Sequence, residues 1–354
     1  MQKYPIKNVV HFLVAAGVIY LYFINSAAFS VYVKEALQLC YNTVIPSLFI
    51  FMVFASYLAS LNVCRFIGLP FVPVFRLLNI CDRKIISYCV LGILSGFAAG
   101  GYFLNRIREE FDCDKNMLGI ISIILSNNSP AFVISAVGTI MLGSFYSGIM
   151  LYCSILLSGI ITAFIFSFIF PYHQPVPVKN TDNTNMGVSY AINSSVYSLL
   201  NICGAVVFSY SVCKVISLYS KNMAVSVAFS VLTEVTSACS IITECYGKNL
   251  YLVCIALSFC PLSTCLQLKS HINSNDFSLK ILLLSKIVHI PLSLLIMRIA
   301  VNLFPQSFAV YASGDINVNM YWNAPHISCW LFILSICFVI CFDKKIGVFT
   351  KAVK

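Results

Sequence analysis

Several stretches of this sequence are apolar over about 20 residues, the length that a helix needs to cross the hydrocarbon core of a bilayer. The uninterrupted stretches are Val9–Phe29, Val44–Leu61, Tyr146–Phe170, Ser194–Tyr219, Ile281–Val301 and the shorter Ile327–Phe342. They lack the alternating pattern of an outer-membrane barrel. Hydrophobic residues make up 60% of the chain and charged residues only 10%, against roughly 45–50% and about 25% in soluble domains. The sequence therefore predicts an all-α polytopic membrane protein embedded in a lipid bilayer.

Basic residues outnumber acidic ones by 22 to 12, which gives a net charge of +10. Lys and Arg of membrane proteins gather in cytoplasmic loops, so this excess indicates topology and no nucleic-acid partner. In one topology most of the Lys and Arg residues of this chain fall in cytoplasmic segments. In that topology both termini are cytoplasmic, and two apolar segments each dip into the membrane and return to the same side. The 16 Cys residues form no Cys-x-x-Cys pair and the five His residues are far apart. We therefore expect no metal and no resident cofactor, leaving a coupling cation or proton open.

The order of apolar segments repeats along the chain. Each repeat has a span, a dipping segment (85–110 or 224–247), a helix broken by polar residues, and a second span. The two dips are entered from opposite sides, so the repeats are inverted, which indicates a secondary transporter with a site near the midplane. The predicted division is 1–43 (N-terminal transmembrane helix and amphipathic lead-in), 44–171 (first inverted repeat), 172–193 (polar linker), 194–301 (second inverted repeat) and 302–354 (outer loop, last transmembrane helix and basic cytoplasmic tail).

The tip of the first dip is rich in small residues. Ser95, Gly96 and Gly100 allow a tight reversal of the chain and let a ligand approach the backbone. The alternative is close helix packing through the same small residues. We assign the three to substrate binding.

The first broken helix carries the strongest polar interruption. Unwound backbone inside a bilayer must face protein or a water-filled cavity. Asn127, Asn128 and Ser129 offer donors and acceptors for a substrate. Pro130 begins a half-helix whose N-terminus suits an anion, and we assign it to gating. The alternative is a kinked helix whose Asn side chains bond to neighbouring helices.

In the second repeat, Glu234 is the only acidic residue deep within an apolar segment. Such a carboxylate is a candidate for coupling or gating, or for a structural hydrogen bond to a facing helix. Thr236 adds a hydroxyl for substrate. The polar residues that correspond to the break of the first repeat are Pro261, Ser263 and Gln267. We assign Pro261 to gating. Ser263 and Gln267 are four residues apart, so both can lie on one helix face, and we assign them to substrate binding.

The last span of the second repeat carries weaker signals. His289 and Pro291 are typical of a kinked span with one satisfied histidine. Lys286 and Arg298 are placed toward opposite ends of the same helix, and Arg298 is expected to reach the outer interface. With no basic residue placed deep in the predicted site, helix dipoles or a bound cation would neutralise an anionic substrate.

Five short motifs occur in a fixed order between about residues 40 and 300. They are Pro46-Ser47-Leu48-Phe49, Ser95-Gly96-Phe97 with Gly100, Asn127-Asn128-Ser129-Pro130 with Val137-Gly138, Glu234-Val235-Thr236, and Leu262-Ser263 with Leu266-Gln267. This set resembles the YlbJ-type sporulation integral membrane proteins, which carry the nucleoside-recognition Gate domain. The departures at Ala98-Ala99-Gly100-Gly101 and Cys260-Pro261 fall at the predicted site and bear on substrate identity.

The resemblance implies a fold like that of the concentrative nucleoside transporters, with two re-entrant hairpins and two broken helices, and a homotrimer by analogy. For the sporulation members it implies movement of dipicolinate, a small aromatic dianion, across the outer forespore membrane. We therefore expect a secondary transporter of a small organic anion, with dipicolinate as the leading candidate. Transport of a nucleoside or another small molecule, and a scaffold for spore assembly, are the alternatives. No Ser/His, HExxH or paired-Asp arrangement at membrane depth favours an enzyme.

Overall fold

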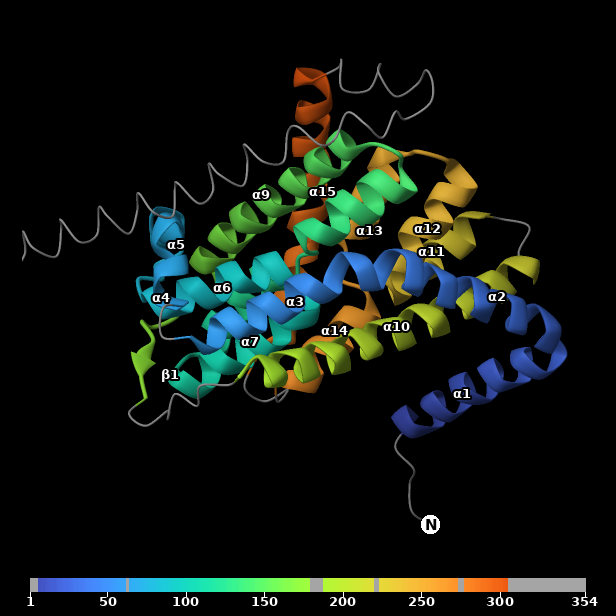
Figure 1. The fold of residues 1–354 in the computed structure, drawn as a ribbon, viewed down its shortest axis with the longest axis horizontal. Helices are drawn as coiled ribbons and strands as arrows, with labels where there is room; N and C mark the ends of the chain where they lie inside the picture. Colours follow the sequence, from blue (N-terminus) through green and yellow to red (C-terminus); the bar gives the residue numbers. More distant parts are fainter. Residues whose placement is uncertain (1–5, 62–63, 179–186, 220–222, 273–276, 305–354) are drawn as a thin grey trace, which may run out of the picture.

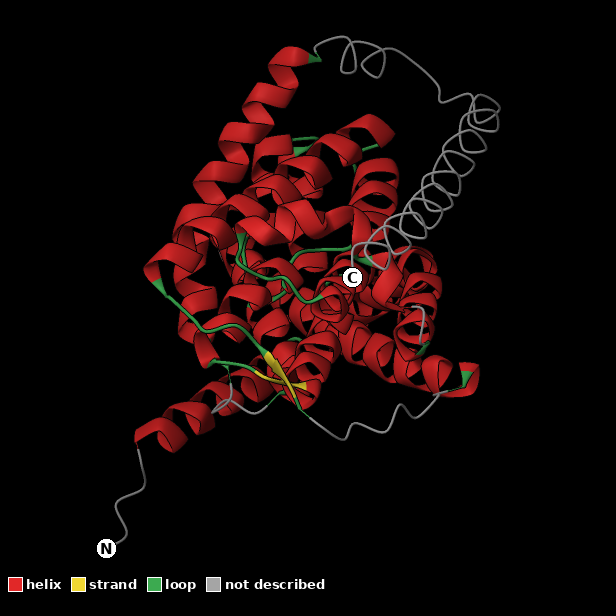
Figure 2. Cartoon of the chain, turned by 90° about the vertical axis from the view of Figure 1, so that its left-hand side faces the viewer, coloured by secondary structure: helices red, strands yellow, loops and turns green. Residues whose placement is uncertain are grey.

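The computed structural model describes residues 6–61, 64–178, 187–219, 223–272 and 277–304 of the 354-residue chain. Helices dominate this part, and its two short strands, β1 (Phe111–Asp112) and β2 (Val176–Pro177), pair antiparallel (Figure 2). Among the described residues, the segments long and apolar enough to cross a membrane are Ser26–Ala59, Phe145–Ile169, Val188–Tyr219, Leu250–Lys269 and Leu279–Leu303. This is the make-up expected of an all-α polytopic membrane protein.

The N-terminal helices differ from the expected boundaries. α1 (Ile6–Ile24) ends before Asn25, whose side-chain amide donates to the Leu21 carbonyl oxygen at 3.0 Å and so competes with the helical bonding pattern. α2 (Ser26–Leu39) then continues through a π-helical turn, η1 (Cys40–Val44), into α3 (Ile45–Ser60). The predicted lead-in and second span are therefore one long helix, and the π turn comes just before Pro46, which lacks a backbone donor.

Three short helices, α4 (Cys64–Ile67), η2 (Leu69–Phe71) and α5 (Val72–Leu77), lead to a helical hairpin. The hairpin consists of α6 (Arg83–Ser95) and α7 (Phe97–Glu110), which reverse at Gly96. At its open end, the buried Glu110 carboxylate lies 2.6 Å from Lys84 Nζ and 2.8 Å from Arg106 Nη2. The Lys84 contact connects the two arms at the hairpin base, and the Arg106 contact, within α7, holds the Glu110 carboxylate in place.

A second helical hairpin occupies the corresponding place in the other half of the chain. It consists of α11 (Met223–Thr233) and α12 (Val235–Tyr246), and the chain reverses at Glu234, whose backbone is extended. The predicted dips at 85–110 and 224–247 thus correspond to hairpins whose bounds differ by at most two residues. Both hairpins are much shorter per arm than a full span, because each reverses at a polar or small residue.

Each half also contains an interrupted helix. The first is α8 (Lys115–Leu125), a break at 126–130, and η3 (Ala131–Met141), which is π-helical. The second is α13 (Leu250–Ser258), a break at 259–261, and α14 (Leu262–His271). The π-helical form of η3 was not expected from the sequence. It packs closely on α9 (Phe145–Ile169), where a Cβ on Gly138 would lie 2.5 Å from the Cα of Gly148.

Long helices hold the two halves together. α9 packs along α15 (Leu279–Leu303), and α3 packs along α10 (Val188–Tyr219). The hairpins α6–α7 and α11–α12 lie toward opposite ends of the molecule (Figure 1). One buried cluster centres on α6, α7 and α8, and another on α3, η3, α9, α10, α12 and α13. The first hairpin tip lies at the boundary between them, because Phe97 belongs to the second cluster while Ala99 and Phe103 of the same helix belong to the first. The predicted last span at 327–342 and the tail lie outside the described residues.

Candidate functional site

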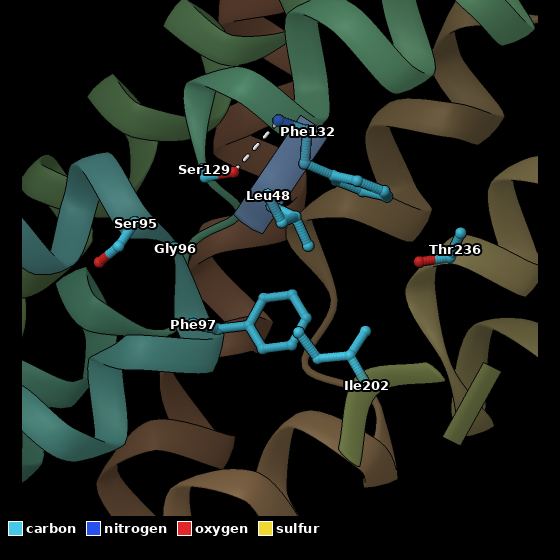
Figure 3. Close-up of a pocket in the computed structure, with 8 residues that line it drawn as sticks. All are labelled: Leu48, Ser95, Gly96, Phe97, Ser129, Phe132, Ile202 and Thr236. Atoms are coloured by element: carbon cyan, nitrogen blue, oxygen red, sulfur yellow. Dashed lines mark hydrogen bonds between the residues drawn. The ribbon is translucent and has the colours of Figure 1, made fainter. Parts of the chain in front are cut away.

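A small cavity lies where both hairpin tips meet the first break (Figure 3). Its lining residues are Ser95, Gly96 and Phe97 of the first tip, Ser129 and Phe132 of the first break, Thr236 of the second tip, Leu48 of α3 and Ile202 of α10. Its volume of ≈ 10 Å³ is about what one water molecule needs. The structure therefore brings together four predicted binding residues, Ser95, Gly96, Ser129 and Thr236, around a space that would hold one water molecule.

The first tip packs directly on the first break. Gly96 has a φ of 80°, a conformation that side chains disfavour, and a Cβ there would lie 2.7 Å from the backbone nitrogen of Ser129. A Cβ on Gly100 would lie 2.3 Å from the carbonyl oxygen of Leu125. Ser95 uses its hydroxyl within α6, donating to Leu91 at 2.7 Å. In this conformation the small residues serve close packing, so a ligand must separate the tip from the break to reach the backbone.

The N-terminus of η3 is capped by its own chain. The Ser129 hydroxyl accepts a hydrogen bond from the backbone N–H of Phe132 at 3.1 Å, drawn as a dashed line in Figure 3. Pro130 has helical dihedral angles at the helix start, where its missing N–H costs nothing. An anion at this helix end would therefore compete with the Ser129 hydroxyl for the Phe132 N–H.

The two asparagines of the break face different neighbours. Asn128 donates from Nδ2 to the carbonyl oxygen of Leu257 at 2.9 Å, which joins the first break to the last turn of α13. Asn127 lies against α9, where a Cβ on Gly159 would come within 2.5 Å of its Nδ2. Among the described residues, neither amide atom of Asn127 nor Oδ1 of Asn128 has a hydrogen-bond partner, although both side chains are buried. Unpaired buried amide atoms are costly and mark a place for water or a ligand.

Glu234 lies at the second tip but does not line the cavity. Its Oε2 accepts a hydrogen bond from the backbone N–H of Ser237 at 2.7 Å, so the carboxylate caps α12. The Ser237 hydroxyl in turn lies 2.9 Å from that of Ser209 on α10. The side chain is 1% exposed. Its structural contact is thus a local helix cap, and the neighbouring Thr236 is the residue that reaches the cavity.

The second break lies to one side of the cavity. Pro261 is extended and precedes α14, which packs against α7, and the Gln267 carbonyl oxygen lies 3.3 Å from where a Cβ on Gly101 would stand. Ser263 is buried and its hydroxyl has no partner among the described residues. Pro261, Ser263 and Gln267 therefore do not line the cavity at the two tips, and α14, which carries Ser263 and Gln267, packs on α7 of the first hairpin.

A basic residue lies at the first break, contrary to expectation. Lys286 of α15 is 5% exposed, and its Nζ lies 3.3 Å from Ser126 Oγ and 3.2 Å from His289 Nδ1. His289 Nε2 donates to the Ile155 carbonyl oxygen at 3.1 Å. The sequence does contain a signal, because Lys286, His289 and Ser293 are spaced i, i+3, i+7 on one helix face. Hydropathy alone placed Lys286 toward a helix end.

No group of three or more His, Cys, Asp or Glu residues that could hold a metal ion occurs within the described ranges. Comparisons of the chain with protein-family models, with curated proteins and with solved structures find no match.

Proposed function

We propose that this protein is a secondary transporter that moves a small organic anion across a membrane by alternating access. The leading candidate substrate is dipicolinate, a choice that comes from the ordered motifs. In this proposal both termini are cytoplasmic, and the membrane is a bacterial cell membrane or the outer forespore membrane. The protein acts in spore formation, alone or as a homo-oligomer.

The observation that carries the proposal is a set of buried polar atoms, at or directly after the two breaks, that have no hydrogen-bond partner among the described residues. They are both amide atoms of Asn127, Oδ1 of Asn128 and the hydroxyl of Ser263. A packed structural kink would satisfy these groups, since unpaired buried polar atoms cost free energy. A site that opens to water and substrate in another conformation accounts for them, because their partners arrive with the ligand.

The helix contacts support a repeated architecture. α7 of the first hairpin packs on α14, and α12 of the second hairpin packs on η3. Each hairpin thus meets the second half of the other repeat's broken helix. Likewise α3 packs on α6, as α10 packs on α11. Corresponding helices of the two halves thus make corresponding contacts. This pattern fits two inverted repeats with re-entrant hairpins around a central site.

Alternating access in this fold would separate one tip from the break at a time. The contact between Gly96 and Ser129 closes the cavity on the first-hairpin side, and Thr236 faces it from the second. Substrate carboxylates would take hydrogen bonds from Asn127, Asn128 and Ser129 once the tip moves away. Glu234 at the second tip would link this movement to a coupling cation or a proton.

Reconstituted proteoliposomes test the proposal. The full chain is inserted into liposomes, and uptake of radiolabelled pyridine-2,6-dicarboxylate and uridine is measured with imposed sodium and proton gradients. We expect saturable uptake of the dicarboxylate and none of uridine above empty liposomes. Uptake of uridine alone would assign a nucleoside-type transporter. Absence of uptake of both solutes under all gradients would reject transport of this substrate class.

A further inference from the structure

Lys286 is a buried cation whose surroundings do not neutralise it. Within the described part of the chain, no carboxylate lies within ion-pair distance of its Nζ, although Lys84, Arg106 and Lys214 all have acidic partners. Burying an unpaired ammonium group costs several kcal/mol. Intramembrane lysines retained at such a cost mark a functional position.

The hydrogen bonds of Lys286 leave one donor available. Because the Ile155 carbonyl can only accept, Nε2 of His289 carries the ring proton and Nδ1 accepts from Lys286. The Ser126 hydroxyl donates to the Ile123 carbonyl at 3.1 Å and accepts the second Lys286 N–H. An ammonium group has three donors; within the described ranges the third has no partner, so it remains for a ligand. Both of its present partners are neutral.

The unpaired Asn127 amide lies on the same side of the structure. Asn127 packs at Gly159 of α9, and His289 bonds to Ile155 of the same helix. Positions 155 and 159 are one turn apart on one face. Ser126, which contacts Lys286, is the residue next to Asn127. We call Ser126, Asn127, Lys286 and His289 the Lys286 cluster.

The second break adjoins this cluster. On α15, one turn beyond His289, the hydroxyl of Ser293 lies 2.7 Å from that of Ser258, the last residue of α13 before the second break. α15 packs on α13 as well as on α8, which leads into the first break. Lys286 therefore stands between the two interruptions, which Asn128 joins by its bond to Leu257. This is the position from which one positive charge can act on a ligand held between the two repeats.

We propose that Lys286 is the residue that binds a carboxylate of the transported anion, with the Asn127 amide as a second donor. His289 and Ser126 orient the ammonium group, and the carboxylate accepts the remaining N–H of Nζ. This proposal rests on the transport function proposed above, and it adds that the transporter selects its substrate by negative charge. A mono- or dicarboxylate is recognised, and an uncharged molecule of the same shape is not.

Binding to the purified full-length protein tests this assignment. Thermal unfolding is measured with pyridine-2,6-dicarboxylate and with its uncharged analogue pyridine-2,6-dicarboxamide, for wild type, Lys286→Met, Lys286→Arg and the exposed control Lys280→Met on the same helix. We expect the dicarboxylate to stabilise wild type and Lys280→Met, and Lys286→Met to bind it about 10- to 100-fold more weakly. Lys286→Arg keeps part of the affinity, because it keeps the charge.

A second readout separates a binding residue from a structural one. Without ligand, Lys286→Met is expected to unfold at a higher temperature than wild type, because an apolar side chain of similar length replaces an unpaired buried charge. Unchanged dicarboxylate affinity in Lys286→Met, or a wild type that binds the dicarboxamide equally well, would overturn the assignment. Unchanged affinity together with loss of proton-driven uptake would also overturn it and make Lys286 a proton carrier.

The same samples distinguish this inference from the proposed function. Wild type that binds the dicarboxylate through Lys286 but does not transport it in proteoliposomes would contradict the transport proposal alone. Wild type that transports it, with Lys286→Met transporting equally well, would contradict the Lys286 assignment alone. Wild type that shows no dicarboxylate binding would overturn the Lys286 assignment directly.

Discussion

The Asn128 side chain donates a hydrogen bond from Nδ2 to the main-chain carbonyl oxygen of Leu257 at 2.9 Å, across 129 residues of sequence. This bond joins the first break to the end of α13, the helix that precedes the second break. Replacing Asn128 with Ala leaves the buried Leu257 carbonyl without this donor. We expect a loss of about 1 kcal/mol of stability, since bonds between helices within membranes are modest. Thermal unfolding measures it, and Asn105→Ala on the half-exposed face of α7 is the control. Equal melting temperatures for Asn128→Ala and wild type would show that the bond contributes nothing.

The contact of Gly96 with Ser129 predicts that Gly96→Ala is severe. A methyl group there meets the Ser129 backbone nitrogen at 2.7 Å, and a φ of 80° disfavours any side chain. We expect a loss of about 1–3 kcal/mol and a first tip that no longer closes on the break. Gly204→Ala on α10 is the matched control, because a Cβ there has nothing within 4 Å. Similar stability of both variants would contradict the packing derived for the tip.

The two interpretations of Glu234 are separated by Glu234→Gln. A glutamine keeps an oxygen that can accept from the Ser237 N–H, so the α12 cap and the stability should largely survive. If Glu234 carries the coupling ion or proton, dicarboxylate uptake should lose its dependence on the imposed gradient. Glu234→Ala, which removes the cap as well, should cost about 1 kcal/mol in addition. Gradient-driven uptake by Glu234→Gln at the wild-type rate would leave the carboxylate with its capping role only.

Outside the membrane, Asp114 gives the protein a defined acid sensitivity. The backbone N–H of His173 lies 2.6 Å from Asp114 Oδ2 and its ring 3.0 Å away, and these bonds hold the pKa of the carboxyl below its usual 3.8. A depressed folded-state pKa contributes stability above the unfolded value and loses it as the pH falls through the folded value. Wild type should therefore be more stable than Asp114→Asn at pH 6, and the difference should shrink below about pH 4. A difference that stays constant from pH 6 to pH 3 would exclude the bond as its source.

The hairpins and broken helices were predictable from sequence because polar or small residues interrupt apolar runs at recognisable places. Gly96 and Glu234 mark reversals, and the run from Asn127 to Pro130 marks a break. These signals are local, so they locate an element without stating what it packs against. The sequence did not reveal that Gly96 lies on Ser129, or that α14 packs on α7 of the first hairpin and leaves Ser263 and Gln267 out of the cavity.

Lys286 shows why the chemistry of the site was harder to predict. Its burial depends on the face that α15 presents to α8 and α9, which is a tertiary relationship. In the sequence, Lys286 lies toward one end of the hydrophobic run, which suggested a residue near the membrane interface. The helical spacing with His289 and Ser293 indicated a polar face, but only the contact with Ser126 connects that face to the break. The continuous path from α2 into α3 was missed for a similar reason, since a π turn before Pro46 keeps the helix going.

If the polar atoms at the breaks that lack partners among the described residues bind the transported anion, removing them must lower its uptake. Uptake of radiolabelled pyridine-2,6-dicarboxylate into proteoliposomes is compared for wild type, Asn127→Ala and Ser195→Ala at equal reconstituted amounts. Ser195 is the matched control, because its hydroxyl is also buried without a partner in the described part of the chain but belongs to α10 and to neither break. The account predicts at least about a tenfold loss of uptake in Asn127→Ala and near-normal uptake in Ser195→Ala. Near-normal uptake in Asn127→Ala would contradict it.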